Sequence, residues 1–234
     1  MKIFLRIRSP VLIVGFFLWS CGGKPDPVIE MQESLASAPE YMILLEDMRE
    51  DGTFSTDYYH RYKVIQGSRE RVTGWIEVSE STFRKYEPFL GMALVAKSDQ
   101  GVNKTPHPPG YHYTGNPQYG RWANRGGSSF WEFYGQYAMM QNLMGWGGRT
   151  VYRADYDDYR TSRNRGRPYY GRVGSDRRTR EFGTRGSITQ KQKPKVFERR
   201  KQAAARKRQS FAQKVQSRTG RSRSGYGSRG RGGK

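Results

Sequence analysis

Three histidines are the side chains of this sequence best suited to acid–base or metal chemistry, and they are His60, His107 and His112. His107 and His112 stand five positions apart in a segment rich in proline and glycine. A helical zinc site needs two histidines at positions i and i+4, so that both imidazoles share one face. The spacing instead indicates two solvent-exposed loop histidines, and we expect no metal site.

Other side chains that could act as nucleophiles or ligands also lack the required spacing. Ser128 and Ser129 are outside any Gly-x-Ser-x-Gly context, so we expect them to cap a helix. The aspartates within residues 155–158 have no glycine-containing calcium loop around them, and we expect them to neutralise Arg153 and Arg160. No Gly-x-Gly-x-x-Gly motif opens a helix after a strand, and no P-loop is present. The sequence predicts a non-enzymatic protein without a catalytic residue or cofactor.

The single cysteine, Cys21, follows a sequence typical of a secretory signal. Lys2, Arg6 and Arg8 precede an apolar run over residues 11–18, and small residues surround the cysteine. A run of this length is too short to cross a bilayer, which takes about 20 apolar residues in a helix. One thiol also excludes an intramolecular disulfide framework.

The segment Leu18-Trp19-Ser20-Cys21 resembles the lipobox of bacterial lipoproteins, although Trp19 stands where a small residue is commoner. The resemblance implies that residues 1–20 are a signal peptide and that Cys21 is diacylated on its thiol and becomes the first residue of the mature chain. Gly22, rather than Asp, follows the cysteine. By analogy with enteric lipoproteins, this permits transfer to an outer membrane facing the periplasm. The alternative is a chance cysteine after an ordinary signal peptide or membrane-inserted start.

Positive charge is concentrated in the last third of the chain. Residues 1–148 hold 15 basic and 15 acidic residues, whereas residues 149–234 hold 27 basic and 6 acidic residues and carry the whole net charge of +21. A neutral body followed by a cationic tail indicates a polyanionic partner for the tail.

We expect the tail, residues 149–234, to be mostly disordered because it is rich in Arg, Gly and Ser, with one possible helix over residues 195–216. The candidate polyanion-binding residues are Arg199, Arg200, Lys201, Arg206, Lys207, Arg208, Arg221, Arg223, Arg229 and Arg231. A solvated tail without function is the alternative.

Residues 37–105 predict a small α+β domain with the order α-β-β-α-β. A helix is expected to begin near Ser37, because apolar residues recur at positions 41, 44, 45 and 48. Residues 58–65 and 72–78 read as a β-hairpin, residues 82–87 as a short helix and residues 92–96 as a buried strand. Residues 21–36 read as an extended linker to the lipid.

Residues 106–148 form a Gly/Pro-rich segment with many aromatic residues. We expect a turn-rich stretch around residues 120–122 and a helix from Ser128 or Ser129 to Met144, which would pack on the small domain as an aromatic cover. Two interpretations of the aromatic side chains remain open. They complete a core with few aliphatic residues, or they form a contact surface for a sugar, a peptide or a membrane interface. The candidates for such a surface are Tyr119, Trp122, Trp131 and Tyr134.

Residues 115–122 (GNPQYGRW) and 127–137 (GSSFWEFYGQY) resemble a group of uncharacterised bacterial lipoproteins, and the similarity extends back to about residue 54. This resemblance implies no activity and no site residues.

The sequence as a whole predicts a non-enzymatic lipoprotein of the bacterial cell envelope. It would be anchored to a membrane through Cys21, and its tail would bind an anionic lipid, lipopolysaccharide or wall polymer. The alternative is an RNA- or DNA-binding protein that acts through its Arg/Gly/Tyr-rich tail.

Overall fold

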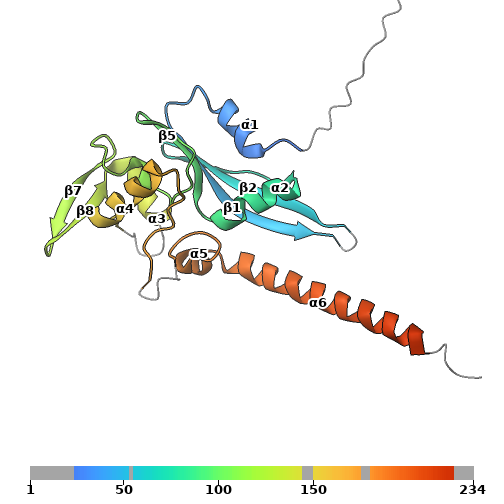
Figure 1. Cartoon of the computed structure of the whole chain (residues 1–234). Coiled ribbons are helices and arrows are strands. Elements are labelled where there is room, and N and C mark those ends of the chain that lie inside the picture. Colours follow the sequence, from blue (N-terminus) through green and yellow to red (C-terminus); the bar gives the residue numbers. More distant parts are fainter. Residues whose placement is uncertain (1–23, 53–54, 144–149, 175–179, 224–234) are drawn as a thin grey trace, which may run out of the picture.

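An antiparallel sheet lies at the centre of the molecule, with helices packed around it, which is the predicted α+β class (Figure 1). The computed structural model describes residues 24–52, 55–143, 150–174 and 180–223. The strands are β1 (Tyr41–Asp51), β2 (Asp57–Gln66), β3 (Arg69–Val72), β4 (Ile76–Val78), β5 (Ala93–Ser98), β6 (Gly101–Asn103), β7 (Gly120–Arg125) and β8 (Ser128–Phe133). The main sheet has the order β3-β2-β1-β5-β6, and β4 also pairs with β2. β7 and β8 form a separate hairpin.

Helices cover both the main sheet and the hairpin. They are α1 (Pro27–Ser34), α2 (Glu80–Tyr86), α3 (Met139–Leu143), α4 (Arg153–Asn164), α5 (Ser187–Gln192) and α6 (Pro194–Arg223), with 3-10 turns η1 (Glu87–Phe89), η2 (Tyr111–Tyr113) and η3 (Gly135–Ala138). We call the described residues from 24 to 193 the body. α6 extends away from it (Figure 1).

β1 is the central strand, and it occupies the place where the sequence predicted a helix from Ser37. Its side chains alternate between two cores. Met42 and Leu44 belong to one, while Ile43 and Leu45 belong to the other. A strand buried on both faces is a continuous apolar run, and such a run also satisfies helical spacing. The helix prediction was wrong for this reason.

α1 replaces part of the extended linker predicted over residues 21–36. Asp26 caps it by accepting a hydrogen bond from the backbone N–H of Val28 at 3.0 Å, and Pro27 occupies the first helical position. Asp26 also accepts hydrogen bonds from the side chains of Lys85 and Tyr86, both at 2.8 Å. α1 is therefore fixed against α2, with Val28 buried. Asp followed by Pro was the sequence signal for this helix start.

The predicted hairpin, short helix and buried strand correspond to β2 to β5. β2 pairs with β3 and β4, which together replace the single strand expected over residues 72–78. α2 begins two residues earlier than predicted, because Ser79, and not Ser81, accepts the capping hydrogen bond from the backbone N–H of Thr82. β5 pairs with β1 and with β6.

The helix predicted from Ser128 or Ser129 to Met144 is instead the hairpin β7–β8 followed by η3 and α3. Gly126 and Gly127 have positive φ values of 56° and 77°, which suits a two-residue hairpin turn. Trp131 and Phe133 alternate inward on β8. The expected turn-rich stretch at residues 120–122 is strand β7, and Ser128 and Ser129 are strand residues rather than helix caps.

The prediction that residues 149–234 are mostly disordered was wrong for the described part. The core that contains Met42 and Leu44 is rich in aromatic side chains, and we call it the aromatic core. Five of its side chains come from residues 151–188, and they are Val151, Tyr159, Tyr169, Phe182 and Ile188. The segment is also tied to earlier residues by backbone hydrogen bonds, from Trp131 N–H to the Val151 carbonyl at 2.8 Å and from Tyr169 N–H to the Pro106 carbonyl at 3.0 Å. The helix proposed over residues 195–216 lies within α6.

Candidate functional site

α6 is the element that presents most of the predicted polyanion-binding residues. It has 30 residues and is therefore about 45 Å long, at 1.5 Å per residue. Its first turns dock on the body, where Val196 is buried in the core beside α2 and Phe197 is partly buried against it. Residues 204–218 are all exposed, and Lys207 is the last residue of α6 with a described salt bridge to the body.

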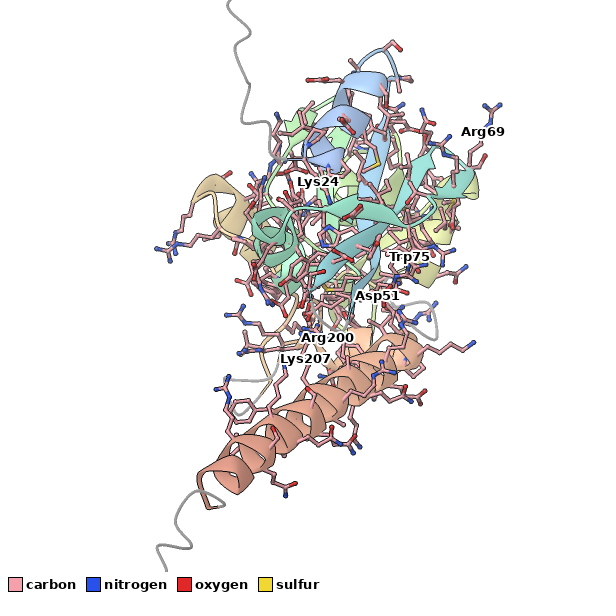
Figure 2. All side chains as sticks on the ribbon, turned by 90° about the vertical axis from the view of Figure 1, so that its right-hand side faces the viewer. Lys24, Asp51, Arg69, Trp75, Arg200 and Lys207 are labelled. Carbon is pink, nitrogen blue, oxygen red and sulfur yellow. The ribbon has the colours of Figure 1, made fainter. Side chains whose placement is uncertain are left out.

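Four acidic side chains of the body bind the first half of α6 and the residue before it. Lys193 donates to Glu46 at 2.7 Å, and Arg199 contacts both carboxylate oxygens of Asp47, at 2.6 and 2.7 Å. The other two ion pairs join Arg200 to Glu87 and Lys207 to Glu50. Figure 2 shows Arg200 and Lys207 where α6 passes the end of the sheet near Asp51. We call Arg199, Arg200 and Lys207 the docked cations.

A second set of α6 side chains is exposed and makes no salt bridge within the part of the chain that the structure describes. We call its members from residue 201 onward the outer cations, and they are Lys201, Arg206, Arg208, Lys214 and Arg218. Arg221 and Arg223 belong to the last turn of α6. Arg229 and Arg231 lie outside the described residues. The structure thus separates the predicted set into cations that hold the helix and cations that remain available to a partner.

Two apolar side chains stand among the outer cations. Phe211 is 69 % exposed and Val215 is 43 % exposed, and they lie one and two turns beyond Lys207. Residues four apart share one helix face, so the pair forms an apolar patch that Arg208 and Arg218 flank. A helix face of this composition suits the boundary between lipid headgroups and acyl chains.

The four candidate aromatic residues do not form one surface. Tyr119 and Trp131 are 2 % and 1 % exposed and belong to the aromatic core. Neither can contact a partner, so they complete the core instead. Trp122 is half-buried and Tyr134 is 45 % exposed. Trp122 lies beside α4, with its ring centroid 5.7 Å from that of Tyr156.

His107 and His112 are buried, at 0 % and 2 % exposed, which contradicts the expectation of two solvent-exposed loop histidines. His107 donates through Nδ1 to the Thr105 carbonyl at 2.8 Å, and His112 Nε2 lies 3.0 Å from the hydroxyl of Ser98. Burial lowers the pKa of His107 to about 3 and that of His112 to about 4. Ser98 is itself only 3 % exposed, so a substrate cannot reach this pair without opening the core.

His60 is the third buried histidine, and it stacks on Phe83 and contacts the Tyr62 hydroxyl at 2.9 Å. Burial lowers its pKa to about 4. Within the described residues, no group of three His, Cys, Asp or Glu side chains is placed to hold a metal ion.

The aspartates of α4 differ from one another in their surroundings. Asp157 pairs with Arg153 at 3.6 Å, as expected. Asp155 is instead buried, 3.7 Å from Arg172, and burial raises the pKa of its carboxyl group.

Cys21 lies outside the described residues. None of the helices in the described ranges has the length and apolar character needed to span a bilayer.

No protein-family model matches the chain, and no curated protein or solved structure shows significant similarity to it. The resemblance of residues 115–137 to bacterial lipoproteins therefore stays a prediction.

Proposed function

We propose that this protein is a non-enzymatic envelope lipoprotein. It is anchored through Cys21, and its basic helix α6 binds an anionic surface or polymer of the envelope. The observation that carries the proposal is the division of the α6 cations into two sets. The body neutralises the docked cations and fixes the direction of the helix, whereas the outer cations stay exposed between Lys201 and Arg218.

The magnitude of the attraction follows from the number of outer cations. A basic side chain close to an anionic leaflet contributes about 1 kcal/mol at moderate salt. Five such side chains therefore contribute on the order of 5 kcal/mol, which corresponds to a change of several thousandfold in affinity. The interaction weakens as salt screens the exposed charges.

An anionic lipid surface fits α6 better than a soluble polymer does, because of Phe211 and Val215. Both apolar side chains are exposed, and burying them between lipid headgroups would add a hydrophobic contribution that does not depend on salt. A signal peptide would also place the protein outside the cytoplasm, where lipid headgroups and envelope polymers are the abundant polyanions. Two attachment signals together hold a protein on a membrane more firmly than either one alone.

Vesicle flotation tests the role of α6. The protein without residues 1–23 is mixed with vesicles of phosphatidylglycerol and phosphatidylcholine, or of phosphatidylcholine alone. The salt concentration is varied from about 50 to about 500 mM, because salt over this range progressively screens the attraction between exposed charges. The K201Q/R206Q/R208Q variant should lose most of the binding to the anionic vesicles. The matched control, R69Q/R71Q/R167Q, removes three exposed charges from the body and should bind as the unmodified protein does.

A substitution of Phe211 separates lipid from other polyanions. Phe211→Ser should weaken binding to anionic vesicles and leave binding to single-stranded RNA unchanged. RNA binding that exceeds vesicle binding at equal salt, with no effect of Phe211→Ser on either, would favour the nucleic-acid alternative instead.

Fatty-acid labelling tests the anchor independently. Cells that produce the unmodified protein or Cys21→Ser are grown with radiolabelled palmitate and then fractionated. We expect label only on the unmodified protein, which should be found in the envelope fraction. Unlabelled, full-length protein in the cytosol would overturn the lipoprotein proposal and leave nucleic acid as the expected partner.

A further inference from the structure

A separate basic cleft, which shares no lining residue with α6, lies between helix α4 and the turn that precedes β7. It has a volume of about 510 Å³ and is open to solvent. Its lining residues are Gln100, Gly115, Trp122, Arg153, Tyr156, Arg160, Arg163 and Asn164. We call it the α4 cleft.

The side chains of α4 that line the cleft share one helix face. Relative to Arg153, the others stand at i+3, i+7, i+10 and i+11, and this spacing keeps all of them within about 100° of the helix circumference. Asp158, at i+5, lies outside this arc. Asp155 and Tyr159 are buried in the body, and Tyr159 stands one turn before Arg163, so the face that lines the cleft adjoins the buried face of the helix. The packing of α4 therefore fixes which side chains face the cleft.

Two of the guanidinium groups lie over aromatic rings. The Arg153 guanidinium lies 4.8 Å from the centre of the Trp122 ring, and that of Arg160 lies 5.9 Å from the centre of the Tyr156 ring. These contacts hold two long side chains at the cleft, so a ligand would restrict them less than it would restrict free arginines.

The cleft contains more positive charge than the neighbouring carboxylates neutralise. Asp157 pairs with Arg153 at 3.6 Å, and Asp99 accepts a hydrogen bond from Asn116 at 2.8 Å. Within the described residues, no carboxylate lies within salt-bridge distance of Arg160 or Arg163. Two guanidinium groups at one cleft thus lack counter-charges.

We propose that the α4 cleft binds a polyvalent oxyanion, meaning a polar molecule that carries at least two phosphate or carboxylate groups. Guanidinium groups bind both anions through paired hydrogen bonds. Arg160 and Arg163 bind the anionic groups, Arg153 adds charge at the Trp122 end, and the amides of Gln100 and Asn164 supply further polar contacts. The volume suits a small molecule or one unit of a polymer.

Isothermal titration calorimetry with pyrophosphate and with citrate tests this site on the protein without residues 1–23, at a salt concentration of about 0.15 M. Pyrophosphate represents phosphate-bearing ligands, and citrate represents polycarboxylates. We expect saturable binding of at least one of them at one site per chain. R160Q/R163Q should weaken that binding by at least tenfold, because hydrogen bonds to charged groups are lost.

Two control variants distinguish specific anion binding in the α4 cleft from non-specific attraction of anions to a basic protein. R165Q/R167Q removes the same charge just after α4, outside the cleft, and should leave the affinity within about twofold of the unmodified protein. R160Q alone, at an exposed helix position, provides a variant with little effect on folding. The α6 variant K201Q/R206Q/R208Q should keep pyrophosphate or citrate binding, so this test is independent of the proposed function of α6.

The proposal is overturned if neither anion binds at a single saturable site, or if R165Q/R167Q weakens binding as much as R160Q/R163Q does. Tighter binding of pyrophosphate would identify phosphate as the natural group, and tighter binding of citrate would identify carboxylate.

Discussion

Gly115→Ala tests whether α4, which the sequence placed in a disordered tail, packs on the body as described. Gly115 has a positive φ of 84°. A Cβ atom at this position would lie 2.5 Å from the Tyr156 hydroxyl oxygen and 2.7 Å from the carbon that bears it. Tyr156 belongs to α4 and its ring contacts Trp122 and Tyr159, so it cannot move aside without disturbing these neighbours.

The size of the destabilisation by Gly115→Ala follows from comparison with Gly126→Ala. Gly126 also has a positive φ, of 56°, but a Cβ there would meet nothing within 4 Å. Both substitutions incur about 1–2 kcal/mol for the left-handed backbone conformation, and both reduce the entropy of the unfolded chain equally. Gly115→Ala adds the cost of overpacking, about 1–3 kcal/mol. In a protein of this size, that difference lowers the melting temperature by a further 2–12 °C or so.

Urea unfolding followed by tryptophan fluorescence measures the difference. The double variant Gly115→Ala/Tyr156→Ala completes a double-mutant cycle, and the coupling free energy should recover the extra 1–3 kcal/mol or so, because the alanine side chain leaves room for the new methyl group. Equal stability of Gly115→Ala and Gly126→Ala, with no coupling to Tyr156, would refute the packing of α4 against this turn.

Three further predictions concern acid stability, helix docking and the extent of the fold. Burial keeps the folded-state pKa of all three histidines below the unfolded value of about 6.5, so the free energy of unfolding should hold above that pH and fall as the pH drops toward 4. In pH-dependent urea unfolding, His112→Asn should reduce this loss by about a third, and an unchanged loss would contradict the reasoning. Asp47→Asn should speed tryptic cleavage after Arg199 severalfold, because Asp47 holds the Arg199 side chain. Glu30→Gln, a control on α1, should leave the cleavage rate unchanged. Equal rates in both variants would exclude a role for the Asp47–Arg199 ion pair in docking α6. A fragment of residues 24–148 should lack cooperative thermal unfolding by circular dichroism, whereas residues 24–200 should retain it; a cooperative transition in the shorter fragment would show that the later segments are dispensable.

The sequence predicted the α+β class and several elements correctly, because local signals were strong there. β2 has the alternation of a half-buried strand, and α2 begins at a serine with an acidic residue in its first turn. The possible helix in the tail also agrees with α6, since its alanines and long basic side chains favour the helical state.

The other predictions failed where tertiary burial outweighed the local pattern. β1 is apolar on both faces, so its periodicity did not distinguish strand from helix. Most residues of α4 are polar, and only Asp155 and Tyr159 are buried, at i and i+4. The arginines of the α4 cleft were interpreted as tail charges for the same reason. Their i, i+7 and i+10 spacing was visible, but their position beside Trp122 depends on the fold.

Closure of both cores by late residues has a consequence for biosynthesis. Lys193 reaches back 147 positions to Glu46, and Arg199 reaches back 152 positions to Asp47. Val196 and Ile188 complete the two cores on the two faces of the sheet. A nascent chain therefore exposes unfinished cores until nearly all of it has left the ribosome, and such distant contacts form slowly. For a chain that crosses a membrane as an unfolded polymer, this order of assembly delays folding until translocation is nearly complete.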